Sequence, residues 1–328
     1  MRLVITVDTE ADNQWDVTAP QTVENLSAVP RFQSLCEEYD FAPTYLCTYE
    51  VVTSPAFERA IGSAADAGRA EVGAHLHPWS TPPFDAAWDG AGAALPYPHE
   101  LPRTLLADKL ETLTSAVRAR SGRAPTSYRA GRWGFSETHV PILTSLGYEV
   151  DCSVTPGVSW RHDIGLRAGG PDFLPAGVEP YELAGQDVCR RGGSGLLEVP
   201  VTILHTSRPM RACAGLRRSY ARHRRSLPWR AADRLFQVAP QWLRPFPHMT
   251  AERLVGVCEL GRRLRLPVLE MMFHSSELLP GASPYNPTSE AVDGLFDRLA
   301  RVFEHLASTG VRGATLTEFA RAHSARDR

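Results

Sequence analysis

The chain has 328 residues, of which 43% are hydrophobic and 22% charged, and a formal net charge of −2 at pH 7. This is the composition of a soluble globular protein with a sizeable core, and the near-neutral charge argues against a nucleic-acid-binding protein and against an acidic tail. The six cysteines have no CxxC spacing, so we expect reduced thiols rather than a disulfide framework or a zinc knuckle.

The first residues, MRLVITV, run directly into a strand pattern without a basic leader or a cleavage site. No stretch approaches the roughly 18 uncharged apolar residues that a membrane-spanning helix needs. We therefore expect a cytoplasmic protein without a membrane span.

Short apolar runs alternate with longer amphipathic stretches along the chain. The apolar runs predict strands at residues 2–7, 43–48, 71–76, 126–130, 147–153, 196–203 and 267–273. The amphipathic stretches predict helices at 22–40, 54–68, 101–121, 136–146, 250–264, 288–309 and 316–325, with Ser136 and Thr250 as N-caps. Such alternation gives parallel strands joined by right-handed crossovers. The pattern favours an α/β fold with a distorted (β/α) barrel of about seven parallel strands in a single domain, residues 1–328; a doubly wound sheet is the alternative.

Two segments interrupt this alternation. Residues 80–100 are rich in proline, glycine and aromatic residues, which is typical of a long surface loop. Residues 205–248 contain ten arginines and one acidic residue, Asp233, and we interpret them as an insertion within the domain. This insertion is either a helical excursion with a solvated arginine face or a basic amphipathic segment. The second interpretation implies peripheral contact with an anionic membrane, at its inner face, or with a substrate pyrophosphate.

Polar residues that could take part in chemistry lie at or directly after the ends of five of the seven predicted strands. In chain order they are Asp8, Glu10, His75, His77, Arg129, Arg132, Asp151 and His274. Taken singly, each is more often a turn former, a salt-bridge partner or a structural histidine. Because the carboxyl ends of the strands converge at one rim in β/α folds, we expect these side chains to lie together, and this favours a functional site.

The residue types at this rim suit hydrolysis assisted by a metal ion. One carboxylate and two neutral imidazoles are a ligand set for Zn²⁺ or a similar divalent ion, and such an ion lowers the pKa of a bound water from about 15.7 toward ~7. Asp8 could then act as general base and His274 as general acid. Arg129, paired with a carboxylate such as Asp151, could hold Asp8 ionised and correctly oriented.

Five short segments resemble, in their order, the motifs of the polysaccharide deacetylase family (NodB-homology domain), and the similarity is greatest to its WalW-like branch. They are VDTE at 7–10, GAHLHPW at 73–79, YRAGRWGF at 128–135, YEVDCSVTP at 148–156 and MMFHSSEL at 271–278. The resemblance covers roughly residues 3–280. It implies a distorted β/α barrel and metal-dependent removal of an N-acetyl group from an acetylamino sugar.

The resemblance also implies roles for individual residues. Asp8 takes the role of the base, Glu10 that of the metal carboxylate, and Arg129 and His274 those of the arginine that steadies the base and of the acid. Asp151 matches the fourth motif. The family usually spaces its two metal histidines four residues apart, whereas Trp79 stands four residues after His75 in this chain. Either His77 replaces the second ligand through strand geometry, or the metal has fewer protein ligands.

The substrate and the reaction leave alternatives open. Trp79, Trp133 and Trp160 could stack on a sugar ring, with Arg132 as a further contact. For a chain without a leader, we expect the acetylamino sugar to be part of a nucleotide sugar, a lipid-linked saccharide or a small glycoside. The first alternative is hydrolysis of another C–N bond by a deformylase or a ureide amidase, with or without a metal. The second is a non-catalytic saccharide-binding protein, which would not need Asp8, Arg129 and His274 together.

Overall fold

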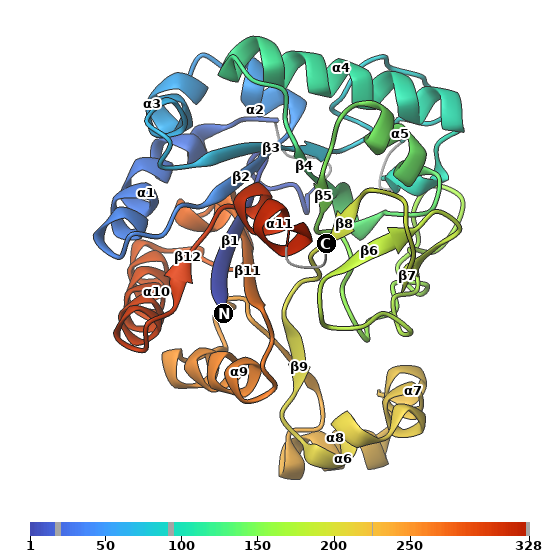
Figure 1. The fold of residues 1–328 in the computed structure, drawn as a ribbon, viewed down its shortest axis with the longest axis vertical. Coiled ribbons are helices and arrows are strands. Elements are labelled where there is room, and N and C mark those ends of the chain that lie inside the picture. Colours follow the sequence, from blue (N-terminus) through green and yellow to red (C-terminus); the bar gives the residue numbers. More distant parts are fainter. Residues whose placement is uncertain (17–20, 91–94, 225, 326–328) are drawn as a thin grey trace.

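Seven parallel strands form the curved sheet at the centre of the molecule, in the order β11, β1, β2, β3, β4, β5, β8 (Figure 1). The computed structural model describes residues 1–16, 21–90, 95–224 and 226–325. The strands are β1 (Arg2–Thr9), β2 (Thr44–Cys47), β3 (Glu71–Leu76), β4 (Ser127–Ala130), β5 (Val150–Asp151), β8 (Leu197–Glu198) and β11 (Val268–His274). The predicted α/β fold with a distorted barrel of parallel strands is confirmed.

The parallel sheet is extended and partly closed by other segments. β12 (Arg312–Gly313) pairs with β1, and an antiparallel hairpin of β6 (Tyr181–Ala184) and β7 (Asp187–Arg191) continues from β8. The backbone N–H of Thr202 donates to the carbonyl of Glu270 at 3.2 Å, so the chain that follows β8 reaches β11 at the other end of the parallel strands. The sequence did not predict the hairpin, because β6 and β7 are short and half exposed.

Helices cover the outer face of the curved sheet (Figure 1). They are α1 (Val29–Glu38), α2 (Tyr49–Thr53), α3 (Ser63–Asp66), α4 (Arg103–Ser121), α5 (His139–Ser145), α9 (Ala251–Arg263) and α10 (Ser289–Ser308). Two further short helical segments, η1 (Glu24–Ser27) and η2 (Glu58–Gly62), precede α1 and α3 in the chain. The hydroxyl of Thr250 accepts a hydrogen bond from the N–H of Arg253 at 3.3 Å, which confirms the predicted cap. The cap predicted at Ser136 is wrong, because α5 begins after Thr138 and Ser136 contacts His139 instead. Among the described residues, no helix is both long and apolar enough to span a membrane.

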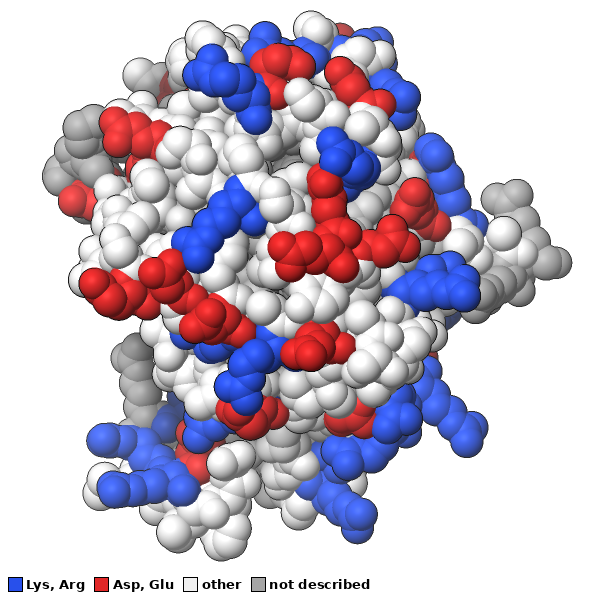
Figure 2. All heavy atoms as spheres, turned by 90° about the vertical axis from the view of Figure 1, so that its left-hand side faces the viewer, with Lys and Arg blue, Asp and Glu red and all other residues white. Residues whose placement is uncertain are grey.

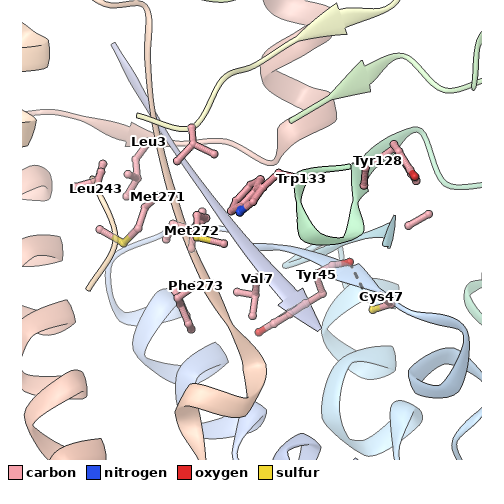
Figure 3. Close-up of a cluster of buried hydrophobic side chains, with 14 of the residues drawn as sticks. Leu3, Val7, Tyr45, Cys47, Tyr128, Trp133, Leu243, Met271, Met272 and Phe273 are labelled. Carbon is pink, nitrogen blue, oxygen red and sulfur yellow. Dashed lines mark hydrogen bonds between the residues drawn. The ribbon is translucent and has the colours of Figure 1, made fainter. Parts of the chain in front are cut away.

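Side chains of the parallel strands alternate between two environments, as expected for extended chains. In β1, Leu3, Ile5 and Val7 belong to the large apolar cluster, part of which Figure 3 shows. Val4 belongs instead to a second apolar cluster, together with Leu46, Val150 and residues of α11 (Leu316–Ser324). The N–H of Leu316 donates to the hydroxyl of Thr44, at the start of β2, so α11 covers the amino-terminal end of the barrel. The polar residues named from the strand ends, such as Asp8 and His75, lie at the opposite, carboxyl-terminal end of the barrel.

The long loop predicted at 80–100 is fastened by Lys109, the only lysine of the sequence. Its buried ammonium group donates to the carbonyls of Pro78, Thr81 and Pro83 at 2.9, 2.6 and 2.8 Å, and pairs with the carboxylate of Asp89 at 2.8 Å. Residues 91–94 of this predicted loop lie outside the described residues. Lys109 lies on α4 and thus ties the segment that follows His75 and His77 to this helix.

The arginine-rich segment predicted at 205–248 forms three short helices between two strands. β9 (Ile203–His205) and β10 (Pro240–Trp242) pair antiparallel, and between them lie α6 (Arg208–Ala212), α7 (Ala214–His223) and α8 (Leu227–Phe236). In Figure 1 this excursion lies at the bottom of the molecule, away from the parallel sheet.

We expect Lys109→Met to lower the free energy of unfolding by about 3 kcal/mol, because it leaves two buried carbonyls, the carbonyl of Pro83 and a carboxylate without their shared donor. Urea unfolding measures the change. The matched control is Arg118→Met, an exposed position on the same helix, which should change the stability by no more than about 0.5 kcal/mol. Equal effects of the two substitutions would contradict the anchoring role.

Candidate metal centre and catalytic cavity

Glu10, His75 and His77 converge at the carboxyl-terminal end of the barrel. Their ligand atoms lie within 4.8 Å of one another, and all three side chains are buried. The Glu10 carboxylate lies 2.8 Å from Nε2 of His77 and 3.5 Å from Nε2 of His75. Both imidazoles therefore present the same nitrogen to the same carboxylate, as a shared metal ion would require.

Neighbouring groups fix the orientation of these three side chains. Nδ1 of His75 lies 3.0 Å from the carbonyl of Arg129, so a proton on Nδ1 leaves the lone pair of Nε2 facing the site. The indole of Trp79 packs against His77, with 4.3 Å between ring centroids. The backbone carbonyl of Glu10 accepts a hydrogen bond from the Asn25 amide at 2.9 Å. The three side chains fit a divalent ion that takes nitrogen and oxygen ligands.

The electrostatics of the three residues favour a positive charge between them. Burial opposes ionisation of Glu10, but His274, His75 and His77 outweigh it and hold its pKa below the ordinary value. Burial lowers the pKa of His77, which favours the neutral imidazole that a metal requires. At His75 burial acts in the same direction, but the carboxylates of Asp8 and Glu10 outweigh it and raise the pKa. A cation, either a proton or a metal ion, is therefore stabilised here.

Asp8 lies beside this centre and is held by Arg129. The Arg129 guanidinium pairs with one carboxylate oxygen, Oδ1, at 2.6 Å, while Oδ2 lies 4.0 Å from His75 and 3.9 Å from His274. Burial would raise the pKa of Asp8, but Arg129 and then the two imidazoles lower it. Asp8 is therefore ionised, with one oxygen restrained and the other facing the histidines.

The second carboxylate that Arg129 contacts is Glu270, at 2.7 Å, and not the Asp151 named from the sequence. Arg129 is fully buried, and its Nε also donates to the carbonyl of Cys152 at 3.0 Å. Asp151 accepts hydrogen bonds from the backbone N–H and the hydroxyl of Ser153, at 2.9 and 2.8 Å. Pairing of Arg129 with Asp151 is thus corrected to pairing with Glu270, and a catalytic role of Asp151 stays a prediction.

His274 faces the centre from the end of β11. Its Nε2 lies 3.9 Å from both Asp8 and Glu10, and its Nδ1 lies 2.9 Å from Glu277 and from Arg244. Arg244 and Glu277 form a buried ion pair of 2.7 Å. One ring nitrogen of His274 is therefore oriented by this pair, while the other faces the carboxylates.

The centre forms the floor of a cavity of about 430 Å³. Its walls include the three residues predicted to bind substrate, Trp79, Arg132 and Trp133, and also Trp15, Tyr97, Trp160 and Tyr285. Arg132 and Trp133 have positive φ angles of 54° and 62°, and the Arg132 guanidinium lies over the Tyr97 ring at 4.1 Å. Trp133 stacks on Trp160, with 6.4 Å between centroids. The cavity thus combines a polar floor with aromatic walls.

Sequence reasoning missed several groups around the site. Glu270 carried a usable signal, because it is a charged residue inside the apolar run of β11, where a buried charge requires a partner. Arg244 carried none, since it is one of ten arginines in its segment. Glu277 follows His274 by three residues, and in the sequence it is only one residue of the motif at 271–278. The catalytic and substrate-binding roles of the residues at this site remain predictions.

No protein-family model and no curated protein matches the chain. Among solved structures, it is similar to a Mycobacterium smegmatis protein provisionally described as a polysaccharide deacetylase (TM-score 0.54, 14% identity, 99% of this chain and 91% of that one). It is also similar to a 4-α-glucanotransferase from Thermococcus litoralis (TM-score 0.51, 12% identity, 98% of this chain but 40% of that one). A family 4 acetyl xylan esterase from Clostridium thermocellum, in complex with a cobalt ion, has a TM-score of 0.44 at 13% identity, over 98% of this chain and 91% of that one.

The similarity to solved structures establishes the fold, which the first two share with this chain. The two differ in the reactions that their descriptions name, so the fold does not select the reaction. The reaction must therefore be inferred from the residues of the site.

We expect Glu10→Gln, His75→Ala and His77→Ala each to weaken binding of Zn²⁺ by roughly 10-fold or more, because each removes a ligand. Titration of the purified, metal-stripped protein with Zn²⁺, followed by calorimetry, measures the affinity. His139→Gln is the control, since His139 is buried outside the cavity and burial lowers its pKa to about 3. Unchanged affinity in His77→Ala would show that His77 is not a ligand.

A second prediction concerns Glu198, which lies opposite Asp151 in the pairing of β5 with β8. Burial and the Asp151 carboxylate raise the pKa of Glu198 well above its ordinary value. The unfolded chain therefore releases a proton that the folded chain retains, and the stability present below about pH 4 is lost as the pH rises toward the folded-state pKa. Glu198→Gln removes this loss.

Urea unfolding between about pH 4.5 and 8 tests this. The advantage of Glu198→Gln over the wild type should grow with pH and reach the order of 1–2 kcal/mol at pH 7–8. Glu149→Gln, which removes an exposed ion pair with Arg321 of 2.6 Å, should show no such gain. An advantage of Glu198→Gln that is independent of pH would contradict the raised pKa.

Proposed function

We propose that this protein is a metal-dependent hydrolase of the polysaccharide deacetylase family, of its WalW-like branch, that removes the N-acetyl group from an acetylamino sugar. The observation that supports the proposal most strongly is the meeting of five groups at one cavity floor: Asp8, Glu10, His75, His77 and His274. A divalent ion such as Zn²⁺, held by Glu10, His75 and His77, would polarise the acetamide carbonyl and lower the pKa of the attacking water.

Asp8 takes the proton of the attacking water in this proposal. Because Arg129 occupies Oδ1, the remaining oxygen Oδ2 is the one that can accept a proton near the histidines. The same ion pair keeps the carboxylate deprotonated and in place before the reaction. A base held in this way needs no rearrangement when the water attacks.

His274 gives a proton to the departing amine. Its Nε2 faces the cavity floor, 3.9 Å from the Glu10 carboxylate, and its Nδ1 lies 2.9 Å from Glu277. Arg244, which pairs with Glu277 at 2.7 Å, lies 2.9 Å from the same ring nitrogen. The two residues thus hold the ring with Nε2 toward the cavity floor.

The aromatic walls would bind the sugar. Trp79 and Trp133 offer apolar ring faces, and Arg132 offers a charged group at the rim. A volume of about 430 Å³ is within the range of small-ligand sites, so one or two sugar units can enter. The physiological substrate would be an acetylamino sugar within a nucleotide sugar, a lipid-linked saccharide or a small glycoside of the cytoplasm.

We expect Asp8→Asn to lower kcat for acetate release by a factor of 10²–10⁴ without loss of bound metal, because the base is removed while the ligands remain. His75→Ala should lose both metal and activity. Acetate release from a panel of acetylamino sugars, together with elemental analysis of the purified variants, measures both quantities.

Three outcomes would contradict the proposal. Near-normal turnover of Asp8→Asn would exclude Asp8 as the base. Release of formate or ammonia from small amides, with no acetate from any acetylamino sugar, would favour the other C–N hydrolases. Tight saccharide binding without any hydrolysis would favour a binding protein.

A further inference from the structure

The excursion formed by α6, α7 and α8 exposes apolar side chains to solvent. Leu227, Leu235 and Phe236 are 78%, 72% and 69% exposed. Leu227, Ala231 and Leu235 are spaced four residues apart on α8, so they form one stripe along the helix. The opposite side of α8 is half buried, since Trp229 packs against Tyr220 of α7 with 5.5 Å between ring centroids. The helix therefore packs one side against α7 and turns an apolar stripe outward.

Arginines surround this stripe. Arg230 and Arg234 lie beside it on α8, three residues after Leu227 and Ala231, respectively. Three further exposed arginines lie on or directly after α7: Arg218, Arg222 and Arg224. No ion pair joins these five to a carboxylate within the described part of the chain, and Asp233 instead accepts a hydrogen bond from the N–H of Ala239 at 2.7 Å. In Figure 2, blue side chains gather toward the lower end of the molecule, where Figure 1 places the excursion.

We propose that the outward surface of α7 and α8 binds peripherally to an anionic phospholipid bilayer. An apolar stripe flanked by arginines is the arrangement by which amphipathic helices lie at the boundary between headgroups and acyl chains. The arginines would contact the phosphates while Leu227 and Leu235 are buried among the chains. A second copy of this chain would suit the surface less well, because it would bring the two sets of unpaired arginines together.

The proposed membrane surface lies beside the catalytic cavity. A second hollow of about 240 Å³, lined in part by Arg217 and Arg224, shares Trp160 and Asp163 with that cavity. Trp242, at the end of the excursion, contacts Trp133 with 6.0 Å between ring centroids. A docked protein would therefore hold its cavity near the bilayer interface. Membrane binding does not depend on the proposed hydrolysis and can be tested without it.

Co-sedimentation of the full chain with vesicles tests the proposal. Vesicles of equal parts phosphatidylcholine and phosphatidylglycerol should bind at least roughly tenfold more tightly than phosphatidylcholine alone, and added salt should weaken the binding. The double variants Leu227→Gln/Leu235→Gln and Arg230→Gln/Arg234→Gln should each lower the partition coefficient roughly tenfold. Circular dichroism checks that they fold.

Matched controls come from the end of α9, where Leu264 and Arg263 are also exposed. Leu264→Gln and Arg263→Gln should leave the partition coefficient unchanged. Equal binding to both vesicle types, no binding, or binding unaffected by the double variants would overturn the proposal. A dimer in sedimentation velocity that Leu227→Gln/Leu235→Gln dissociates, without vesicle binding, would also overturn it and assign the surface to a second copy.

Discussion

The site depends on one buried cation, the guanidinium of Arg129. It extends from β4 across the barrel interior to Asp8 on β1 and Glu270 on β11, at 2.6 and 2.7 Å. In the sheet, β2 and β3 lie between β4 and the adjacent pair β1 and β11. Both contacts of Arg129 therefore require the sheet to curl. Burial of the guanidinium and the two carboxylates costs free energy. The ion pairs offset this cost only because both carboxylates lie within hydrogen-bond distance of Arg129. The contacts of Arg129 therefore depend on the curvature of the sheet, and the ionisation of Asp8 depends on those contacts.

The same residue also orients His75, one of the three candidate metal ligands, through its backbone. The carbonyl of Arg129 faces Nδ1 of His75 at 3.0 Å, while its side chain restrains Asp8. A candidate ligand and the proposed base are thus oriented from a single position on β4. Below them the apolar cluster under α11 excludes water from the amino-terminal half of the barrel, which strengthens each electrostatic contact above it. The amino-terminal half of the barrel is thus apolar, and the charged groups lie at its carboxyl-terminal end.

The sequence predicted those parts of the molecule that follow from local periodicity. β3 was predicted at its observed bounds, and the polar residues near the carboxyl ends of β1, β3 and β11 were expected to meet because parallel strands end at one rim. Partners that depend on tertiary contact were not predictable. Glu270 and Asp151 are both carboxylates at strand positions, and only the curvature of the sheet decides that Arg129 contacts Glu270. Likewise, periodicity predicts amphipathic helices in an arginine-rich segment but cannot tell which of ten arginines reaches His274.

The spacing of His75 and His77 can also be explained physically. Residues two apart in an extended chain point to the same side, about 6.6 Å apart along the strand. His75 lies within β3 and His77 directly after it, and their rings meet edge to face with 4.7 Å between centroids. This brings both Nε2 atoms to Glu10, which a helical turn would achieve with a spacing of four residues. Trp79, at the fourth position, is thereby free to cover His77 and line the cavity. A two-residue spacing at the end of a strand is therefore sufficient to bring two imidazoles to one carboxylate, provided that the carboxylate comes from the neighbouring part of the rim.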